Sequence, residues 1–386
     1  MKYDISESVR YIGADDKTLD LFEGKYVIPD GISYNSYLIL DDKIAVMDTI
    51  DIRKTDEWMD NLLAELGGRT PDYVIVSHME PDHAASLQRL TERFPDIRIV
   101  GNAKTFAMIQ QFFDIAPDCG KVVVKEGDTL PLGTHTLQFF MAPMVHWPEV
   151  MVTYEQSEKI LFSADGFGKF GALDIDADWD CEARRYYFNI VGKYGAQVQA
   201  LLKKAATLDI RTIAPLHGPI LRENLGYYID KYDTWSSYRP ESDGVFIACA
   251  SIYGNTAKAA RALAEILEAK GAKKVSFADL ARDDMAEAVE DAFRYDKLVV
   301  ASSTYDGGIF TPMENFLSQL AHKNYQKRKV AIVENGTWAP MAGRKMREMF
   351  EAMKEIDICE NTATIRSAFK PCDIAHLEAL ADELLA

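Results

Sequence analysis

Short apolar runs separated by polar turns dominate the first half of the chain. The β patterns Tyr34–Leu40 and Ile44–Asp48 flank the polar triplet at 41–43, which predicts a β-hairpin. Helical spacing follows over 54–66, and the pair Gly67-Gly68 predicts the end of that helix. Further strands are predicted at 72–76, 97–100, 136–142, 150–154 and 159–162, with a long helix within 180–206. This succession favours an αββα sandwich whose functional loops lie at one edge of the sheets.

The second half of the chain is more regular. Each predicted strand is followed by an amphipathic helical segment, and the strands fall at Val245–Ala250, Val275–Ala278, Leu298–Ala301, Val330–Val333 and Thr362–Ile365. In the first helix Ala260, Leu263 and Leu267 share one face before Gly271 stops it. Five strands interleaved with helices predict a doubly wound parallel sheet. The polar stretch at 235–242 is the predicted linker, which divides the chain into domains 1–240 and 241–386.

Length and charge narrow the class of protein. A chain of 386 residues with 48% hydrophobic residues is large enough for two or three domains, each with a core. The net charge of −17 argues against nucleic-acid binding, because few cations are available to displace counterions from phosphates.

The five cysteines are widely spaced and form no Cys-x-x-Cys pair, so neither a disulfide framework nor an iron–sulfur or rubredoxin module is expected within this chain. They are Cys119, Cys181, Cys249, Cys359 and Cys372. The residues that follow Met1 do not resemble a signal peptide, and no apolar run approaches membrane-spanning length. We therefore expect a cytoplasmic protein that is not bound to a membrane.

One turn after an apolar strand carries four potential metal ligands. The segment His78-Met79-Glu80-Pro81-Asp82-His83 directly follows the apolar run at 73–76. Three more candidates stand alone in apolar or Gly/Pro-rich surroundings: His146, Asp165 and His217. Four imidazoles and three carboxylates exceed the needs of one tetrahedral zinc, and suit two cations that share a bridging carboxylate. The oxygen-rich set leans toward iron or manganese.

The alternative for each histidine alone is an ordinary structural residue. Seven histidines occur in the chain, and four of them fall into the ordered arrangement above, which favours the metal hypothesis. The other three, His135, His322 and His376, have no ligand partners nearby in the sequence and are assigned no role.

A second candidate site follows the first strand of the doubly wound sheet. Small and hydroxylated residues at 251–256 open the first helix, where backbone N–H groups, side-chain hydroxyls and the helix dipole favour a phosphate. The loop lacks the Gly-Lys-Ser/Thr ending of a Walker loop and the Gly-x-Gly-x-x-Gly of a dinucleotide site.

Two further loops at carboxyl ends of strands, 302–308 and 335–339, carry Tyr305 and Trp338, which could contact an isoalloxazine ring. Ordinary loop aromatics are the alternative, but the three loops in order favour FMN. The predicted contacts are Ser251, Ile252, Tyr253, Gly254, Asn255, Thr256, Ser303, Thr304, Tyr305, Asp306, Gly307, Asn335, Gly336, Thr337 and Trp338.

The first site carries a family resemblance. The signature His-x-His-x-Asp-His marks the metallo-β-lactamase fold, and Glu80 stands here in place of its second histidine. The chain resembles the flavodiiron (A-type flavoprotein) family without a C-terminal rubredoxin extension. The resemblance rests on this change, on His146, Asp165 and His217, and on the sequence segments 33–38, 142–148 and 161–168. The resemblance covers nearly the whole chain. It implies a metallo-β-lactamase-like αββα diiron domain followed by a flavodoxin-like FMN domain.

The resemblance also implies the roles of the ligand candidates. His78, Glu80 and His146 would hold one iron, Asp82, His83 and His217 the other, with Asp165 bridging the two. No catalytic residue is expected beyond the metal ligands, although Glu23, Trp147 and Tyr194 are expected near the same pocket.

The implied activity is that of a terminal reductase. Electrons would pass from FMN to two non-haem irons that reduce O2 to water, NO to N2O, or both. The electron donor would be a separate protein such as rubredoxin, or a reduced deazaflavin. A metal-dependent hydrolase with an appended flavodoxin domain is the first rival, and Glu80 argues against it. An electron carrier with a vestigial metal site is the second, and the complete ligand set argues against it.

The short predicted linker bears on assembly. Two domains with radii of gyration of about 18 and 15 Å have centres roughly 30 Å apart or more, so a flavin need not face the irons of its own chain. A head-to-tail homodimer, or a dimer of such dimers, would bring the two cofactors together, as the resemblance also implies. A monomer with its domains folded back on each other is the alternative.

Overall fold

The computed structural model describes residues 3–115, 120–176 and 178–386, so Cys119 lies outside the described residues. The chain divides into two compact units. The first comprises Met1–Tyr187 and Ala196–Tyr232, and the second comprises Phe188–Gly195 and Asp233–Ala386. The predicted boundary after residue 240 stays a prediction. Each unit is described by itself.

The first unit contains two sheets. The six-stranded sheet has the order β1 (Val9–Tyr11), β6 (Tyr37–Ile39), β7 (Ala45–Met47), β8 (Tyr73–Ile75), β9 (Arg98–Gly101) and β10 (Lys121–Val123). The five-stranded sheet has the order β11 (Thr129–Pro131), β12 (Thr136–Met141), β13 (Met151–Glu155), β14 (Ile160–Phe162) and β15 (Thr212–Ala214). Strands β6 and β7 pair antiparallel, so the predicted hairpin is confirmed.

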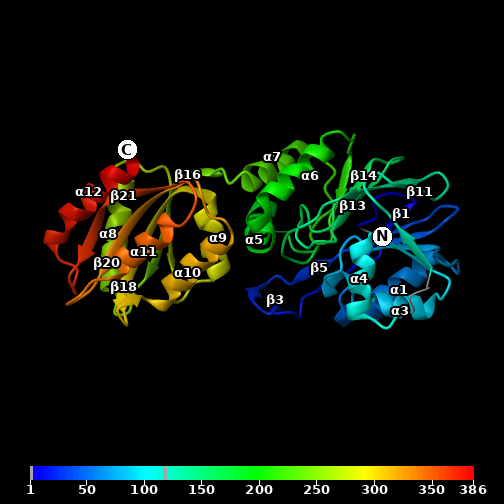
Figure 1. The fold of residues 1–386 in the computed structure, drawn as a ribbon, viewed down its shortest axis with the longest axis horizontal. Helices are drawn as coiled ribbons and strands as arrows, with labels where there is room; N and C mark the ends of the chain where they lie inside the picture. Colours follow the sequence, from blue (N-terminus) through cyan, green and yellow to red (C-terminus); the bar gives the residue numbers. More distant parts are fainter. Residues whose placement is uncertain (1–2, 116–119, 177) are drawn as a thin grey trace. The chain divides into compact units, whose positions relative to one another are not determined.

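The two sheets share one core. Buried side chains of both sheets form a single cluster, among them Ile39, Met47, Ile75, Phe139, Met151 and Phe162. The helices of this unit are α1 (Thr55–Leu66), α2 (Pro81–Ala84), α3 (Leu87–Arg93), α4 (Ala103–Phe112), α5 (Trp179–Tyr186) and most of α6 (Gly195–Ala205) and α7 (Leu225–Ser236). Helices α1, α3 and α4 lie beside the first sheet, and α6 lies beside β13 and β14 of the second (Figure 1). The predicted αββα sandwich is confirmed.

Two short ribbons complete this unit near its functional edge. Strand β2 (Ala14–Asp16) pairs with β5 (Ile32–Tyr34), and β3 (Leu21–Phe22) pairs with β4 (Tyr26–Val27). The predicted helix over 54–66 is α1, and it ends at Gly67 in the left-handed conformation (φ 56°), which a residue without Cβ adopts at little cost.

The long helix predicted within 180–206 is confirmed only in part, because helical turns continue through the segment but its middle is not α-helical. A π-helical turn covers Tyr187–Val191 and a 3-10 turn covers Gly192–Tyr194 between α5 and α6. Tyr187 packs in the first unit against Tyr232, with ring centroids 5.2 Å apart. Its neighbour Phe188 stacks in the second unit on Phe293, at 4.3 Å. Adjacent aromatic side chains with separate packing partners favour an irregular turn over a straight helix, and Gly192 weakens the helix further.

The predicted linker at 235–242 is also too long. Trp235 and Ser236 belong to α7, and β16 begins at Ser242. Trp235 is fully buried, and its Nε1–H donates to Glu241 at 2.7 Å. A buried tryptophan with a paired N–H anchors the end of a helix, so the irregular connection shrinks to 237–241.

The second unit is built on one parallel sheet. Its order is β17 (Val275–Asp279), β16 (Ser242–Ala250), β18 (Tyr295–Tyr305), β20 (Arg328–Asn335) and β21 (Ile356–Ile365), with β19 (Gly308–Ile309) paired to β18. Helices α8 (Asn255–Ala269) and α12 (Ile374–Leu385) cover one face. Helices α9 (Met285–Arg294), α10 (Thr311–His322) and α11 (Ala342–Glu351) lie along the strands on the other side (Figure 1). All five predicted strands are present and parallel, so the flavodoxin-like doubly wound sheet is confirmed.

Within the described part of the chain, none of the helices combines the length and the apolar character needed to cross a bilayer.

Candidate metal centre and candidate flavin site

The first ligand segment is held by the end of a buried strand. Strand β8 ends at Ile75, and the one-turn helix α2 begins at Pro81 with proline at its first position, where no N–H is needed. Between them, Asp48 Oδ1 accepts the backbone N–H groups of Ser77 (2.7 Å) and His78 (3.3 Å). The backbone of the turn is therefore fixed, and its side chains project into one pocket.

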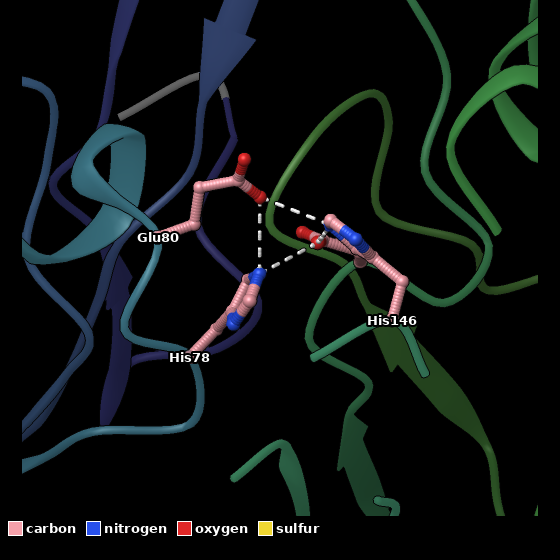
Figure 2. A group of neighbouring side chains, drawn as sticks. His78, Glu80 and His146 are labelled. Carbon is pink, nitrogen blue, oxygen red and sulfur yellow. Dashed lines mark hydrogen bonds and ion pairs between the residues drawn. The ribbon is translucent and has the colours of Figure 1, made fainter. Parts of the chain in front are cut away.

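Three segments of the chain supply the first ligand group. Glu80 Oε2 lies 3.1 Å from His78 Nε2 and 2.9 Å from His146 Nε2. Figure 2 shows the three side chains pointing toward one another. Together with Asp165, their ligand atoms lie within 4.8 Å of one another, close enough to share a metal ion.

The second group consists of Asp82, His83 and His217. Asp82 Oδ2 lies 3.2 Å from His83 Nε2 and 3.1 Å from His217 Nε2, and the two imidazole nitrogens lie 3.0 Å apart. His217 follows β15. Strand β5 orients its ring, because the Nδ1–H of His217 donates to the carbonyl of Ser33 at 2.7 Å. Asn35 secures the same loop by donating to the carbonyls of Pro215 and Gly218 at 2.9 and 2.8 Å.

Asp165 joins the two groups. Its Oδ2 lies 3.3 Å from His78 Nε2 and 3.2 Å from His146 Nε2, while its Oδ1 lies 3.3 Å from His83 Nε2. The carboxylate thus faces one group with each oxygen. It sits in the turn after β14, where Ser163 Oγ donates to the carbonyl of Gly166 at 2.6 Å. A carboxylate in this position could bridge two cations, one beside each group.

The electrostatics of the metal centre reflect densely packed opposite charges. Burial lowers the pKa of His83, but Asp82 and Asp165 outweigh burial and raise that pKa to about 10. Burial likewise lowers the pKa of His146, but the nearby carboxylates of Asp165 and Glu80 outweigh burial and raise that pKa to about 9. Burial raises the pKa of Asp165, but the surrounding imidazoles hold it well below its usual range. The carboxylates therefore favour positive charge between them.

The polar atoms of this centre are satisfied best by cations. Both oxygens of Asp82 and of Asp165 are buried and accept no hydrogen bond from the residues that the structure describes. Two imidazole nitrogens 3.0 Å apart, as in His83 and His217, cannot both carry a proton directed at the other. Buried polar atoms without partners are rare in proteins, and a metal ion on each side of Asp165 would satisfy them. The seven predicted ligands thus fit two metal ions, although their ligation stays a prediction.

One residue of this centre was missed by sequence reasoning. Glu149 is fully buried, and its Oε1 accepts hydrogen bonds from His78 Nδ1–H and from the N–H of Met79, both at 2.8 Å. This bond fixes the ring so that His78 Nε2 faces Glu80 and Asp165. A carboxylate behind a metal-binding histidine commonly orients the ring in this way. The available signal was an acidic residue directly before the apolar strand at 150–154.

The three residues expected beside the pocket have different outcomes. The Trp147 ring lies 5.3 Å from the His78 ring, edge to face. Glu23 has an exposed side chain in the β3–β4 turn, where partial desolvation and then the Glu80 carboxylate raise its pKa above the ordinary value. Tyr194 belongs to the second unit, so its place beside the metal centre stays a prediction. The aromatic neighbours of His217 are instead Phe22, Tyr34 and Tyr186, with ring centroids 5.5 to 5.9 Å away.

The three loops of the second unit converge on one pocket at the carboxyl edge of the sheet, which we call the flavin pocket. Its volume is about 570 Å³, within the range of pockets that hold cofactors. Every predicted contact except Gly254 lines it, and Ala339, Met341 and Ser367 are lining residues that the sequence did not predict. Gly254 instead precedes α8 with a positive φ of 84°.

One end of the flavin pocket suits a phosphate. Helix α8 begins at Asn255, and Thr256 is buried there with its Oγ 2.9 Å from the Oγ of Ser303. Among the described residues that line the pocket, Asp306 alone is charged. Neutral donors at a helix N-terminus are the setting in which a phosphate is bound by backbone N–H groups and hydroxyls.

The other end suits a planar ring. Tyr253 is 92% exposed, Trp338 88% and Tyr305 46%, and all three line the pocket. Large exposed aromatic side chains gathered at a pocket favour a ligand that covers them. Stacking of a flat aromatic system between such rings would remove this apolar surface from water.

Comparison with known proteins covers both units. The model of the ODP family beta lactamase matches residues 32–218, and a flavodoxin domain model matches residues 246–363. A nitric oxide reductase of Moorella thermoacetica is 30% identical to this chain over 381 residues, 94% of this chain and 92% of that protein.

Solved structures agree over the full length. The rubredoxin oxygen:oxidoreductase of the anaerobe Desulfovibrio gigas matches with a TM-score of 0.92 at 25% identity, over 99% of this chain and 97% of that one. A variant of the flavo di-iron protein of Thermotoga maritima matches with a TM-score of 0.89 at 25% identity, over 98% and 95% of the two chains. The similarity therefore spans both units of the chain.

Proposed function

Because the chain belongs to the flavodiiron family of proteins, we propose that it is an oxidoreductase that passes electrons from FMN to a diiron centre, where O2, NO or both are reduced. When bound, FMN exchanges electrons singly or in pairs, and two irons bind and reduce a diatomic gas. The residues of the chain supply the rest. They would hold the metals, keep bulk water away from the buried centre and offer aromatic rings on which a flavin would stack.

The observation that carries the proposal is the position of Asp165. Its two oxygens face two separate groups, His78 with Glu80 and His146 on one side and His83 with its partners on the other. A centre built for one metal would not need a central carboxylate with a ligand group on each side. The carboxylate-rich donor set supports iron over zinc.

The hydrolase rival is disfavoured by Glu80. Its carboxylate stands between two imidazoles, so it replaces a nitrogen donor with a negatively charged oxygen donor. That change favours harder, redox-active cations over a zinc-bound hydroxide. The carrier rival is disfavoured because the flavin pocket and a complete metal centre occur in the same chain.

Cofactor analysis with turnover tests the proposal. Protein produced with iron should contain about two irons and one FMN per chain with little zinc, and should consume O2, NO or both when electrons are supplied by a reduced rubredoxin. Stoichiometric zinc with hydrolase activity would support the rival instead. Absence of gas consumption by protein loaded with iron and FMN would reject the reductase proposal.

The proposal includes a separate electron donor and a cytoplasmic site of action. Rubredoxin or a reduced deazaflavin is the proposed donor. The structure describes Cys249, Cys359 and Cys372 without a disulfide bond, which agrees with a reducing compartment.

The proposal also includes a head-to-tail homodimer, alone or paired into a dimer of dimers. In such a dimer the FMN of one chain serves the irons of its partner, and the symmetric interface is substantial. Two inactive variants, His83→Ala and Asn255→Ala with lost FMN, should regain part of the activity when their subunits exchange. Demonstrated exchange without recovery would contradict the crossed arrangement.

A further inference from the structure

A small apolar cavity lies behind the metal centre in the first unit. Aliphatic side chains of three elements line it: Val152 of β13, Leu161 of β14, and Val198, Leu202 and Ala205 of α6. Neighbouring strand residues such as Met151 and Phe162 face the core between the sheets, so Val152 and Leu161 face α6. The cavity therefore lies between the second sheet and this helix.

The polar groups of the cavity wall are already paired. The Ser163 hydroxyl donates to the carbonyl of Gly166, and the N–H of Phe167 donates to the hydroxyl of Tyr232, both at 2.6 Å. The remaining lining atoms are hydrocarbon. A buried water needs two to four polar partners, so an apolar cavity of this kind stays dry and takes up apolar atoms such as xenon.

The cavity adjoins the segments that carry two ligand candidates. Ser163 and Gly166 lie on either side of Asp165, and Val145 directly precedes His146; all three line the cavity. Its volume is about 20 Å³, compared with the roughly 10–15 Å³ that one water molecule requires. The space suits one small molecule without strong hydrogen-bonding groups.

We propose that this cavity is a binding site for a neutral diatomic gas, which waits there beside the metal centre before it reacts. The inference rests on the proposed function for the identity of the gas. O2 and NO are small and weakly polar, and they partition into apolar surroundings in preference to water. Ala205 contributes only a methyl group to the wall of the cavity, so a larger side chain at this position is expected to fill it. The cavity raises the local concentration of the gas next to Asp165.

Xenon is the probe for the site itself. Crystals of the holoenzyme pressurised with xenon should show one xenon atom against Val152, Leu161 and Ala205. Ala205→Leu should remove that atom by filling the space. Ala200→Leu on the exposed side of the same helix is the matched control and should retain it. Leu202→Phe, at a half-buried position, is a second filling variant if Ala205→Leu unfolds.

Gas kinetics test the role. Rapid mixing of the reduced holoenzyme with increasing O2 or NO should show a several-fold lower second-order rate constant in Ala205→Leu, with an unchanged rate at saturating gas. The Ala200→Leu control should match the unmodified protein. Absence of xenon from the cavity, or equal second-order constants after the cavity is filled, would overturn the inference. A holoenzyme that binds xenon here but reacts with neither gas would instead reject the proposed function.

Discussion

Buried side-chain atoms define the metal centre, whereas backbone segments and exposed aromatic side chains define the flavin pocket. In the metal centre His78, Asp165 and His217 are at most 1% exposed, and side-chain atoms define the site at distances near 3 Å. In the flavin pocket the exposed side chains of Tyr253 and Trp338 surround backbone segments at the ends of strands. A metal ion needs specific donor atoms at fixed positions, whereas a flavin needs amide groups, small residues and a surface for stacking.

This difference predicts how each site responds to substitution. Removal of one metal ligand leaves buried charges unbalanced, because every oxygen of Asp165 faces an imidazole. Removal of one flavin contact leaves many backbone contacts in place. The metal centre should therefore fail abruptly, and the flavin pocket should weaken gradually.

The largest effect is expected for His146→Ala. This change removes a nitrogen that lies near both Glu80 and Asp165, so iron content should fall and turnover should be lost, while bound flavin is unchanged. Iron analysis, flavin absorbance and gas consumption measure the three quantities. His322→Ala, at an exposed position on α10, is the control and should leave all of them intact. Retention of two irons by His146→Ala would contradict the assigned ligand set.

Thr256→Ala should produce a smaller, graded loss in the flavin pocket. It removes a buried hydroxyl at the start of α8, and FMN affinity should fall by about 1–3 kcal/mol, as for other hydrogen bonds to charged groups. Fluorescence titration of the apoprotein with FMN measures the change, and activity should return on addition of excess FMN. Thr256→Ser keeps the hydroxyl and should restore most of the affinity. An unchanged dissociation constant in Thr256→Ala would show that this hydroxyl does not meet the phosphate.

Glu149→Gln tests whether the metal centre depends on residues behind its ligands. The carboxylate orients His78 through Nδ1, so iron affinity should fall by about 10- to 100-fold while the flavin is retained. Competition with a chelator measures the affinity. Glu126→Gln, which removes a partly exposed carboxylate in the same unit, should leave it unchanged. Equal affinities in both variants would reduce Glu149 to a structural role.

The smallest effect concerns a buried histidine outside both sites. His135 Nδ1 lies 3.0 Å from Glu155, and this interaction raises the pKa of His135 above its ordinary value of 6.5, with burial opposing it. Burial raises the pKa of Glu155, but His135 and nearby N–H groups lower it below its ordinary 4.5. The charged form of His135 stabilises the fold fully below pH 6.5, and this stabilisation is lost as the pH rises through the raised pKa. The charged form of Glu155 stabilises the fold above pH 4.5, and this stabilisation is lost as the pH falls through the lowered pKa.

His135→Gln should therefore lower the free energy of unfolding by about 0.5–1 kcal/mol between these two pH values, and by less at pH 9. Denaturant unfolding at pH 6 and pH 9 measures the difference, with His376→Gln on α12 as the control. A larger loss at pH 9 than at pH 6 would contradict the ion pair. The iron and FMN contents of His135→Gln should be unchanged, because His135 belongs to neither functional site.

The same difference explains how much could be predicted from the sequence. Ligand side chains keep their identity in any context, so His78, Glu80 and the rest of that set could be recognised before their proximity was known. The flavin loops could be located from strand ends, and the pocket then included Met341 and Ser367 from outside the predicted loops. The doubly wound strands β16, β18 and β20 were predictable because each contains an uninterrupted apolar run.

Features set by long-range packing could not be predicted in this way. The break at 187–194 depends on separate partners for Tyr187 and Phe188, which no local pattern reveals. The role of Glu149 depends on a bond to His78, 71 residues away in the sequence. Helix α7 continues through Trp235 because that side chain is buried in the core. The polar residues around Trp235 gave no sign of this burial, so the sequence predicted a linker there.

Reoxidation of the reduced flavin tests the central claim most directly. The holoenzyme is reduced without air and mixed rapidly with O2 or NO, and flavin absorbance is followed in the unmodified protein and in His146→Ala loaded with equal FMN. The account predicts rapid reoxidation by at least one gas in the unmodified protein, and only slow reoxidation by either gas in the iron-poor variant, because electrons leave FMN through the metal centre. Equally rapid reoxidation of both proteins would contradict it, since the flavin would then react with the gas without the metals.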